Sequence, residues 1–145
     1  MSLATLNPDA VLAEVLNDNV IVNTTPTKTR TIKAFAANEQ PNNKLPDEYL
    51  NIYQNGVTQS VTKPIGLYRG NLALAIFVKT HSNGTIMVNR IRQIMEQCEA
   101  MVNCKAYEGF YYELDPANVI TPTTTNISTG YSTTIINVEW RTTHG

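Results

Sequence analysis

Residues 63–80 read "KPIGLYRGNLALAIFVKT" and carry the clearest strand pattern in the chain. Side chains alternate between the two faces of a strand, so odd and even positions divide into two sets. One set is Leu72, Leu74, Ile76 and Val78, and the other is Ala73, Ala75 and Phe77. Because both sets are apolar, the stretch predicts a central strand covered on both sides. We expect a helix on one side and either a second layer or a neighbouring subunit on the other.

Two amphipathic segments are expected to supply the helices. Residues 6–18, "LNPDAVLAEVLND", offer Asn7 as the N-cap and Pro8 at the first helical position. Residues 86–102, "IMVNRIRQIMEQCEAMV", place apolar side chains at the i, i+3, i+4 and i+7 spacing of one helix face. Each helix should therefore lie with its apolar stripe on a core.

Three further stretches predict strands: residues 49–57 ("YLNIYQNGV"), 109–114 ("GFYYEL") and 131–141 ("YSTTIINVEWR"). In the last, Ile136, Val138 and Trp140 fall on one face, and we expect Trp140 to anchor the core. The threonine-rich segment before Gly130 is expected to be its hairpin partner. Helices separate from a mainly antiparallel sheet predict an α+β fold, formed by residues 1–145 as a single domain.

Residues 20–35, "VIVNTTPTKTRTIKAF", form an extended segment with a small basic run, Lys28, Arg30 and Lys33. Two interpretations of this segment stay open. It is an exposed strand or hairpin whose alternate residues face water, or a projecting arm that touches a partner or passing DNA. On the second interpretation, the three basic residues are candidate partner-binding residues.

Bulk composition limits the possible functions. The chain has 145 residues, a formal net charge of -1 and 16% charged residues. This balance argues against a dedicated nucleic-acid binder, which needs a concentrated basic surface. The low charged fraction indicates either a surface partly covered by other subunits or a threonine-rich β surface. We find no apolar run of about 20 residues that would predict a membrane span, and no signal-peptide pattern.

Catalytic chemistry is not indicated by the residues. Acyl transfer needs a nucleophile, a base and an orienting acid, and the two histidines stand in a predicted turn (His81) and near the C-terminus (His144). Phosphate-binding loops and dinucleotide fingerprints are missing. We therefore expect no enzyme activity and no cofactor.

Two carboxylate pairs and two cysteines are the further candidate sites in the sequence. We expect Asp47 and Glu48 to lie in a loop, and Glu96 and Glu99 on a solvated helix face. Cys98 and Cys104 have too few possible ligands nearby for a metal, so they are interpreted as reduced structural cysteines.

The order of these elements resembles the tail terminator (tail completion, head–tail joining) proteins of long-tailed bacteriophages. The resemblance is carried by "DEYLNIYQNG" (47–56), "GLYRGNLALAIFVKTHSNGTIMVNRIRQIMEQCEAMV" (66–102) and "STGYSTTIINVEWRT" (128–142). It implies a small α+β subunit that closes into a ring, expected to be hexameric, at the head-proximal end of the tail. It also implies contacts with the tail tube protein and with neck or connector proteins.

The same resemblance implies a location in the tail or neck of the virion, after assembly in the host cytoplasm. DNA would pass through the lumen without specific binding. Two alternatives remain: another phage head–tail connector or neck protein, and, more remotely, a non-viral ligand-binding α+β domain.

Overall fold

The computed structural model describes residues 6–25, 27–37, 39, 45–56, 59–62, 67–115, 126–128 and 130–143. In these residues the chain forms α1 (Pro8–Leu16), β1 (Ile21–Thr25), β2 (Lys28–Thr31), β3 (Lys33–Ala36), β4 (Glu48–Gln54), β5 (Gln59–Thr62), β6 (Leu67–Lys79), α2 (Val88–Val102), β7 (Lys105–Tyr107), β8 (Phe110–Leu114), β9 (Asn126–Ser128) and β10 (Tyr131–Thr142). The predicted α+β fold is confirmed.

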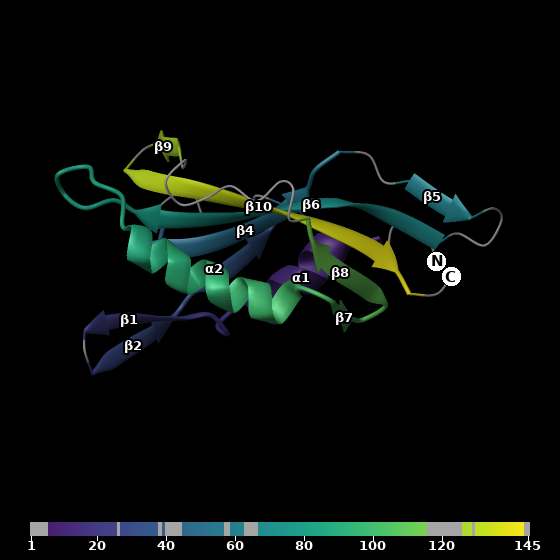
Figure 1. The fold of residues 1–145 in the computed structure, drawn as a ribbon, viewed down its shortest axis with the longest axis horizontal. Coiled ribbons are helices and arrows are strands. Elements are labelled where there is room, and N and C mark those ends of the chain that lie inside the picture. Colours follow the sequence, from purple (N-terminus) through teal and green to yellow (C-terminus); the bar gives the residue numbers. More distant parts are fainter. Residues whose placement is uncertain are drawn as a thin grey trace.

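Most of the strands form one curled sheet in the order β3-β4-β6-β10-β8-β7, with β5 paired to β6 and β9 paired to β10 (Figure 1). Every pairing in this sheet is antiparallel except that of β3 with β4. The β1 and β2 strands form a separate antiparallel hairpin, which projects from the body on the helix side of the sheet (Figure 1). We call this hairpin, residues 21–31, the arm.

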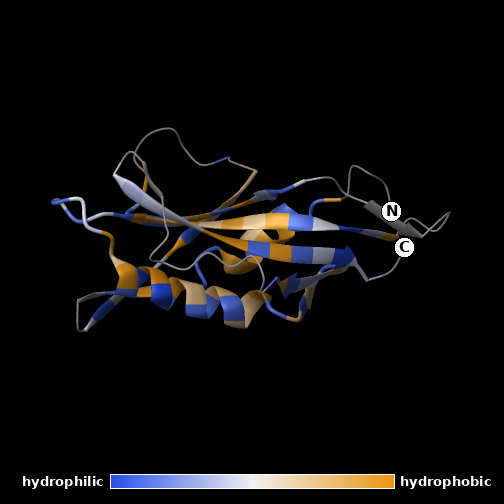
Figure 2. Cartoon of the chain, turned by 45° about the horizontal axis from the view of Figure 1, so that its top comes forward, coloured by the Kyte–Doolittle hydropathy of each residue, from blue (hydrophilic) through white to orange (hydrophobic). Residues whose placement is uncertain are grey.

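The long strand β6 lies at the centre of the sheet, as its sequence predicts, with β4 on one side and β10 on the other. Its apolar set, Leu72, Leu74, Ile76 and Val78, is completely buried. On this face α2 packs against β6, and α1 packs beside it on β3 and β4. Figure 2 shows apolar positions concentrated along the middle of the long strands and on the helices. The helix-covered face therefore holds the main core.

The opposite face of the sheet, which we call the open face, is covered differently. Ala73 and Ala75 are only 1% exposed, so the expected burial of both faces of β6 is confirmed here. Beside them, Tyr49 stacks on Phe77 with ring centroids 4.6 Å apart, and Tyr131 meets the Tyr49 ring edge-on at 5.6 Å. Side chains of the sheet itself thus form an aromatic cluster over one end of this face.

Both helices use the faces that their periodicity predicts. The buried residues of α2 are Ile91, Ile94, Cys98 and Val102, and α1 begins at Pro8. Asn7 is the N-cap of α1, as predicted, but its side chain makes no capping hydrogen bond. Its backbone oxygen accepts the first intrahelical hydrogen bond, from the Val11 N–H, and the proline at the first position needs no capping partner because it has no N–H.

Trp140 is buried to 2% exposure, as predicted, and packs edge-to-face on Phe110 with ring centroids 5.7 Å apart. Its indole lies over Gly70, its register partner on β6. A Cβ atom on residue 70 would meet the indole Nε1 at 2.8 Å, which is closer than two such atoms can approach. Glycine at this position thus makes the room that the tryptophan occupies.

The predicted hairpin partner of the last strand is confirmed at β9, which pairs with the start of β10. Residues 40–44 of the predicted loop and residues 116–125 of the threonine-rich segment lie outside the described residues.

We predict that Gly70 and Trp140 are energetically coupled. Trp140→Ala should lower the free energy of unfolding by about 3–5 kcal/mol, because it leaves a cavity in the core. Gly70→Ala should cost about 1–3 kcal/mol in the wild-type chain through overpacking, and much less in the Trp140→Ala background. Denaturant unfolding of the four proteins measures this coupling. Equal costs of Gly70→Ala in both backgrounds would show that the methyl group does not press on the indole.

Candidate functional site

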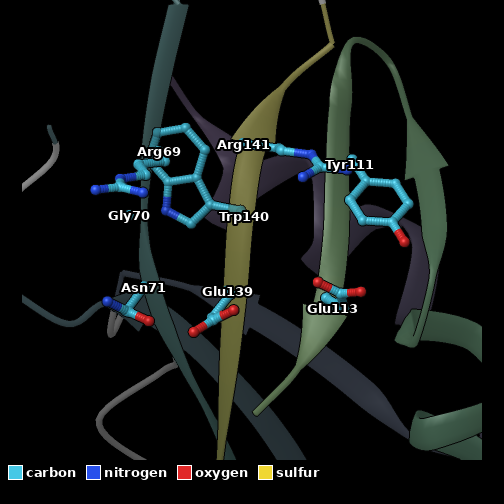
Figure 3. A pocket seen from close by; sticks show the side chains of 8 residues that line it. All are labelled: Arg69, Gly70, Asn71, Tyr111, Glu113, Glu139, Trp140 and Arg141. Atoms are coloured by element: carbon cyan, nitrogen blue, oxygen red, sulfur yellow. The ribbon is translucent and has the colours of Figure 1, made fainter. Parts of the chain in front are cut away.

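A concave feature lined by charged and polar groups lies on the open face, at the end of the sheet where β6 begins and β10 ends. This hollow has a volume of about 370 Å³ and is lined by Arg69, Gly70, Asn71, Tyr111, Glu113, Glu139, Trp140 and Arg141 (Figure 3). We call it the charged hollow. Three adjacent strands, β6, β10 and β8, contribute its lining. The alternation of side chains along these strands places the charged groups away from the helices.

Strand register brings like charges together in the hollow. Arg69 on β6 is the direct partner of Arg141 on β10, and Glu139 on β10 is the direct partner of Glu113 on β8. Like charges directly opposite one another destabilise a sheet. Arg141 lies 4.6 Å from the centroid of the Tyr111 ring, and Figure 3 shows its side chain directed to that ring while the two carboxylates lie side by side. The hollow is therefore divided into a positive row and a negative row.

Cys104 borders the negative row. Its thiol lies 4.0 Å from Glu113 Oε1, and a hydrogen bond between Cys104 and Tyr111 is the main reason that the pKa of the Tyr111 hydroxyl is raised. These contacts join the turn after α2 to β8, so they fix the outer strand of the hollow.

The arm is held to the body by a buried carboxylate. Glu48, 4% exposed, accepts hydrogen bonds from Arg30 of β2 and from Arg90 of α2, one on each carboxylate oxygen. Arg90 also donates to the backbone oxygen of Asn23 in β1 at 2.7 Å. One carboxylate thus connects the arm, a helix and the central sheet, and the prediction that Glu48 lies in a loop is wrong, since it opens β4.

The inner edge of the arm is closed by a side-chain amide. Gln97 of α2 accepts from the Ile21 N–H at 2.8 Å and donates to the Ile21 C=O at 2.6 Å. Ile21 pairs with Thr31 and Asn23 pairs with Thr29. The backbone groups of Ile21 and Asn23 face α2, so they point away from their partners on β2. The backbone groups of Thr31 and Thr29 consequently point away from β1, toward the outer edge of the arm.

The outer edge of β2 is consequently open. Within the residues that the structure describes, no hydrogen bond is made to the outward backbone groups of Thr29 and Thr31. All four side chains of β2 are exposed. An exposed strand edge of this kind is able to pair with another chain.

The three sequence-predicted partner-binding residues occupy different settings. Lys28 is exposed next to the tip of the arm. Arg30 is bound to Glu48 and lies 3.7 Å from Asp47. Lys33 bonds to Asp18 at 2.8 Å, and this bond, followed by one from Thr31, lowers the pKa of the Asp18 carboxyl. Partner binding by these residues stays a prediction, but Arg30 also holds the arm to its own chain, and Lys33 on β3 is paired with Asp18.

The remaining candidates for chemistry are dispersed. Glu96 and Glu99 are exposed on α2, as predicted. Cys98 is buried, which raises the pKa of its thiol to about 12 and suppresses the reactive thiolate. Within the described residues, no three His, Cys, Asp or Glu side chains gather in a way that could hold a metal ion.

Neither a scan against protein-family models nor searches of curated proteins and of solved structures returned a match for this chain. Neither helix in the described part of the chain is long and apolar enough to cross a membrane.

We predict that Glu48→Gln loosens the arm. A neutral amide cannot balance two guanidinium groups, so the free energy of unfolding should fall by about 2–3 kcal/mol. Hydrogen exchange of β1 and β2 amides should accelerate more than that of β6 amides. Asp47→Asn is the matched control, because Asp47 is 54% exposed and its ion pairs are long; it should cost less than about 1 kcal/mol. Equal effects of the two changes would contradict the role given to Glu48.

We also predict that a thiol reagent at neutral pH modifies Cys104 but not Cys98 in the folded protein. We expect this difference because Cys98 is buried and its raised thiol pKa keeps it protonated, whereas Cys104 is exposed. Mass spectrometry should find the folded Cys104→Ser variant unlabelled and its denatured form labelled once. Rapid labelling of this folded variant would show that Cys98 is accessible.

Proposed function

We propose that this chain is a structural subunit that assembles with copies of itself into a closed ring in a phage tail or neck, as the tail terminator proteins that it resembles do. The observation that carries the proposal is the arm with its open outer edge at Thr29 and Thr31. An exposed strand edge presents unpaired backbone groups that can pair with a strand of another chain. A chain that keeps such an edge exposed is therefore suited to self-association.

The arrangement of the molecule also supports a ring rather than a symmetric dimer. The arm lies at one end of the sheet and on its helix side, while the charged hollow lies at the other end and on the open face (Figure 1). Two different surfaces on one subunit give a heterologous contact, and such contacts close into rings when the rotation between neighbours permits. A hexamer is the stoichiometry that the family resemblance favours.

The order of elements gives further support. A helix near the start of the chain, a strand that pairs with the long apolar strand β6, an amphipathic helix and then further strands follow in the order that the resemblance implies. We place the ring at the head-proximal end of the tail, in contact with tail tube and neck or connector proteins, with DNA passing through its lumen. A neck or connector protein at another level of the particle is the alternative, and it would use the same self-assembly.

A ligand-binding domain is less well supported by the geometry. Small-molecule sites are mostly lined by apolar side chains, whereas the lining of the charged hollow includes arginine, glutamate and asparagine side chains. The described residues also offer no group of three His, Cys, Asp or Glu side chains that could hold a catalytic metal ion.

We predict that the purified chain forms rings visible by electron microscopy and that its addition to polymerising tail tube protein shortens the tubes. Capping of one tube end by a ring would account for both results. The Glu48→Gln variant, with its loosened arm, should form fewer rings at the same concentration. A chain that stays monomeric in the presence and absence of tube protein, or that turns over a substrate, would contradict the proposal.

A further inference from the structure

A groove lies where α2 begins, beside the arm. It has a volume of about 780 Å³, and both Asn23 of the arm and the first turns of α2 line it. Its lining residues with full charges are Arg90, Arg92 and Glu96. Arg90 is bound to Glu48 and to the backbone of Asn23. Arg92, in contrast, is exposed, and within the described residues it makes no ion pair or hydrogen bond with its side chain. The groove thus holds a cation whose charge is not balanced by a bound partner.

The turn between β7 and β8 presents an anion. Tyr107 pairs with Phe110, so Glu108 and Gly109 alone form the turn. Their φ angles are 48° and 88°, and a type I′ turn requires such positive values at both positions. Asparagine, aspartate or glycine suits the first position, whereas glutamate is strained there. Residues that keep a strained backbone conformation are concentrated at functional sites.

The Glu108 carboxylate is available for a contact. The residue is exposed, and in the part of the chain that the structure describes its side chain makes no ion pair or hydrogen bond. A guanidinium group such as that of Arg92 binds a carboxylate through two parallel hydrogen bonds. A two-residue turn is narrow and convex, and the groove is concave. The half-buried Met87 in the groove and the half-buried Tyr107 beside the turn add apolar surface. The two surfaces are therefore complementary in charge and in shape.

One chain cannot make this contact with itself. The groove lies at the start of α2, and β7 follows the end of this helix (Figure 1). The helix has 15 residues, which is a length of about 22 Å. The turn also lies on the side of the molecule where β8 lines the charged hollow, away from the arm. A second copy can bring the turn and the groove together, and the contact is then between two different surfaces, as a ring requires.

We propose that the β7–β8 turn of one copy docks in the groove of the next, with the Glu108 carboxylate bound by the Arg92 guanidinium. This inference rests on the proposed self-assembly and names a contact that produces it. Arg90, which bonds to both Glu48 and Asn23, holds the arm side of the groove in place before docking. The tight turn is also rigid before it binds. Both features lower the entropy lost on association.

A substitution at Glu108 separates assembly from folding. Glu108→Asn removes the carboxylate but suits a type I′ turn better than glutamate does. The variant should unfold at the same or a higher denaturant concentration than the wild type, while its assembly weakens by about threefold or more. Sedimentation over a dilution series measures the assembly. Glu99→Gln is the matched control, because it also removes one negative charge but lies exposed on α2 and outside the groove. Its assembly should equal that of the wild type.

A charge swap tests the pairing itself. Glu108→Arg and Arg92→Glu should each weaken assembly by about tenfold or more, because each places like charges together. The double variant should recover most of the wild-type assembly, and circular dichroism checks that each variant is folded. If Glu108→Asn assembles as the wild type does, or if the double variant is no better than the worse single one, the docking contact is wrong while the ring proposal stands. A monomeric wild-type chain would overturn both.

Discussion

The burial of β6 on both faces is the constraint on which the rest of the fold depends. A strand that is apolar on every side must have sheet neighbours at both edges and cover on both faces, and β4, β10 and the two helices supply most of this. Once these elements surround the middle of β6, its polar beginning at Arg69 is left at the end of the sheet. The charged hollow forms there because the apolar pattern stops.

A second constraint comes from the Glu48 carboxylate. A buried charge is tolerated only when it is paired and hydrogen-bonded, and here Arg30 and Arg90 satisfy both of its oxygens. The same two bonds hold the arm against α2 and set the direction in which its tip projects. The arm is thus a positioned element with one closed edge and one open edge, which is the property that self-assembly requires.

Much of the fold could be predicted from the sequence because its strands and helices have strong periodicity. The central position of β6, the core position of Trp140 and the buried face of α2 all follow from alternation or helical spacing. The parallel pairing of β3 with β4 and the short strand β7 were not predicted, since three or four residues carry too little pattern. Asn7 is the N-cap that its residue type predicts, although its side chain makes no capping hydrogen bond.

Only the basic residues of the arm region, and not the charged hollow, could be predicted from the sequence. Lys28, Arg30 and Lys33 are visible in the sequence as a basic run. That Arg30 pairs with Glu48 and Lys33 pairs with Asp18 depends on the folded structure, because these partners are 18 and 15 residues away in sequence. The charged hollow was missed entirely. Its residues come from three strands, and only the register shows that Arg69 faces Arg141 and that Glu113 faces Glu139.

The most direct test of the central claim is the mass of the purified chain in native mass spectrometry over a dilution series. Assembly through two different surfaces that meet in a closed circle predicts one dominant oligomer, with few species between it and the monomer. A monomer at every concentration, or an open-ended ladder of growing species, would contradict the account.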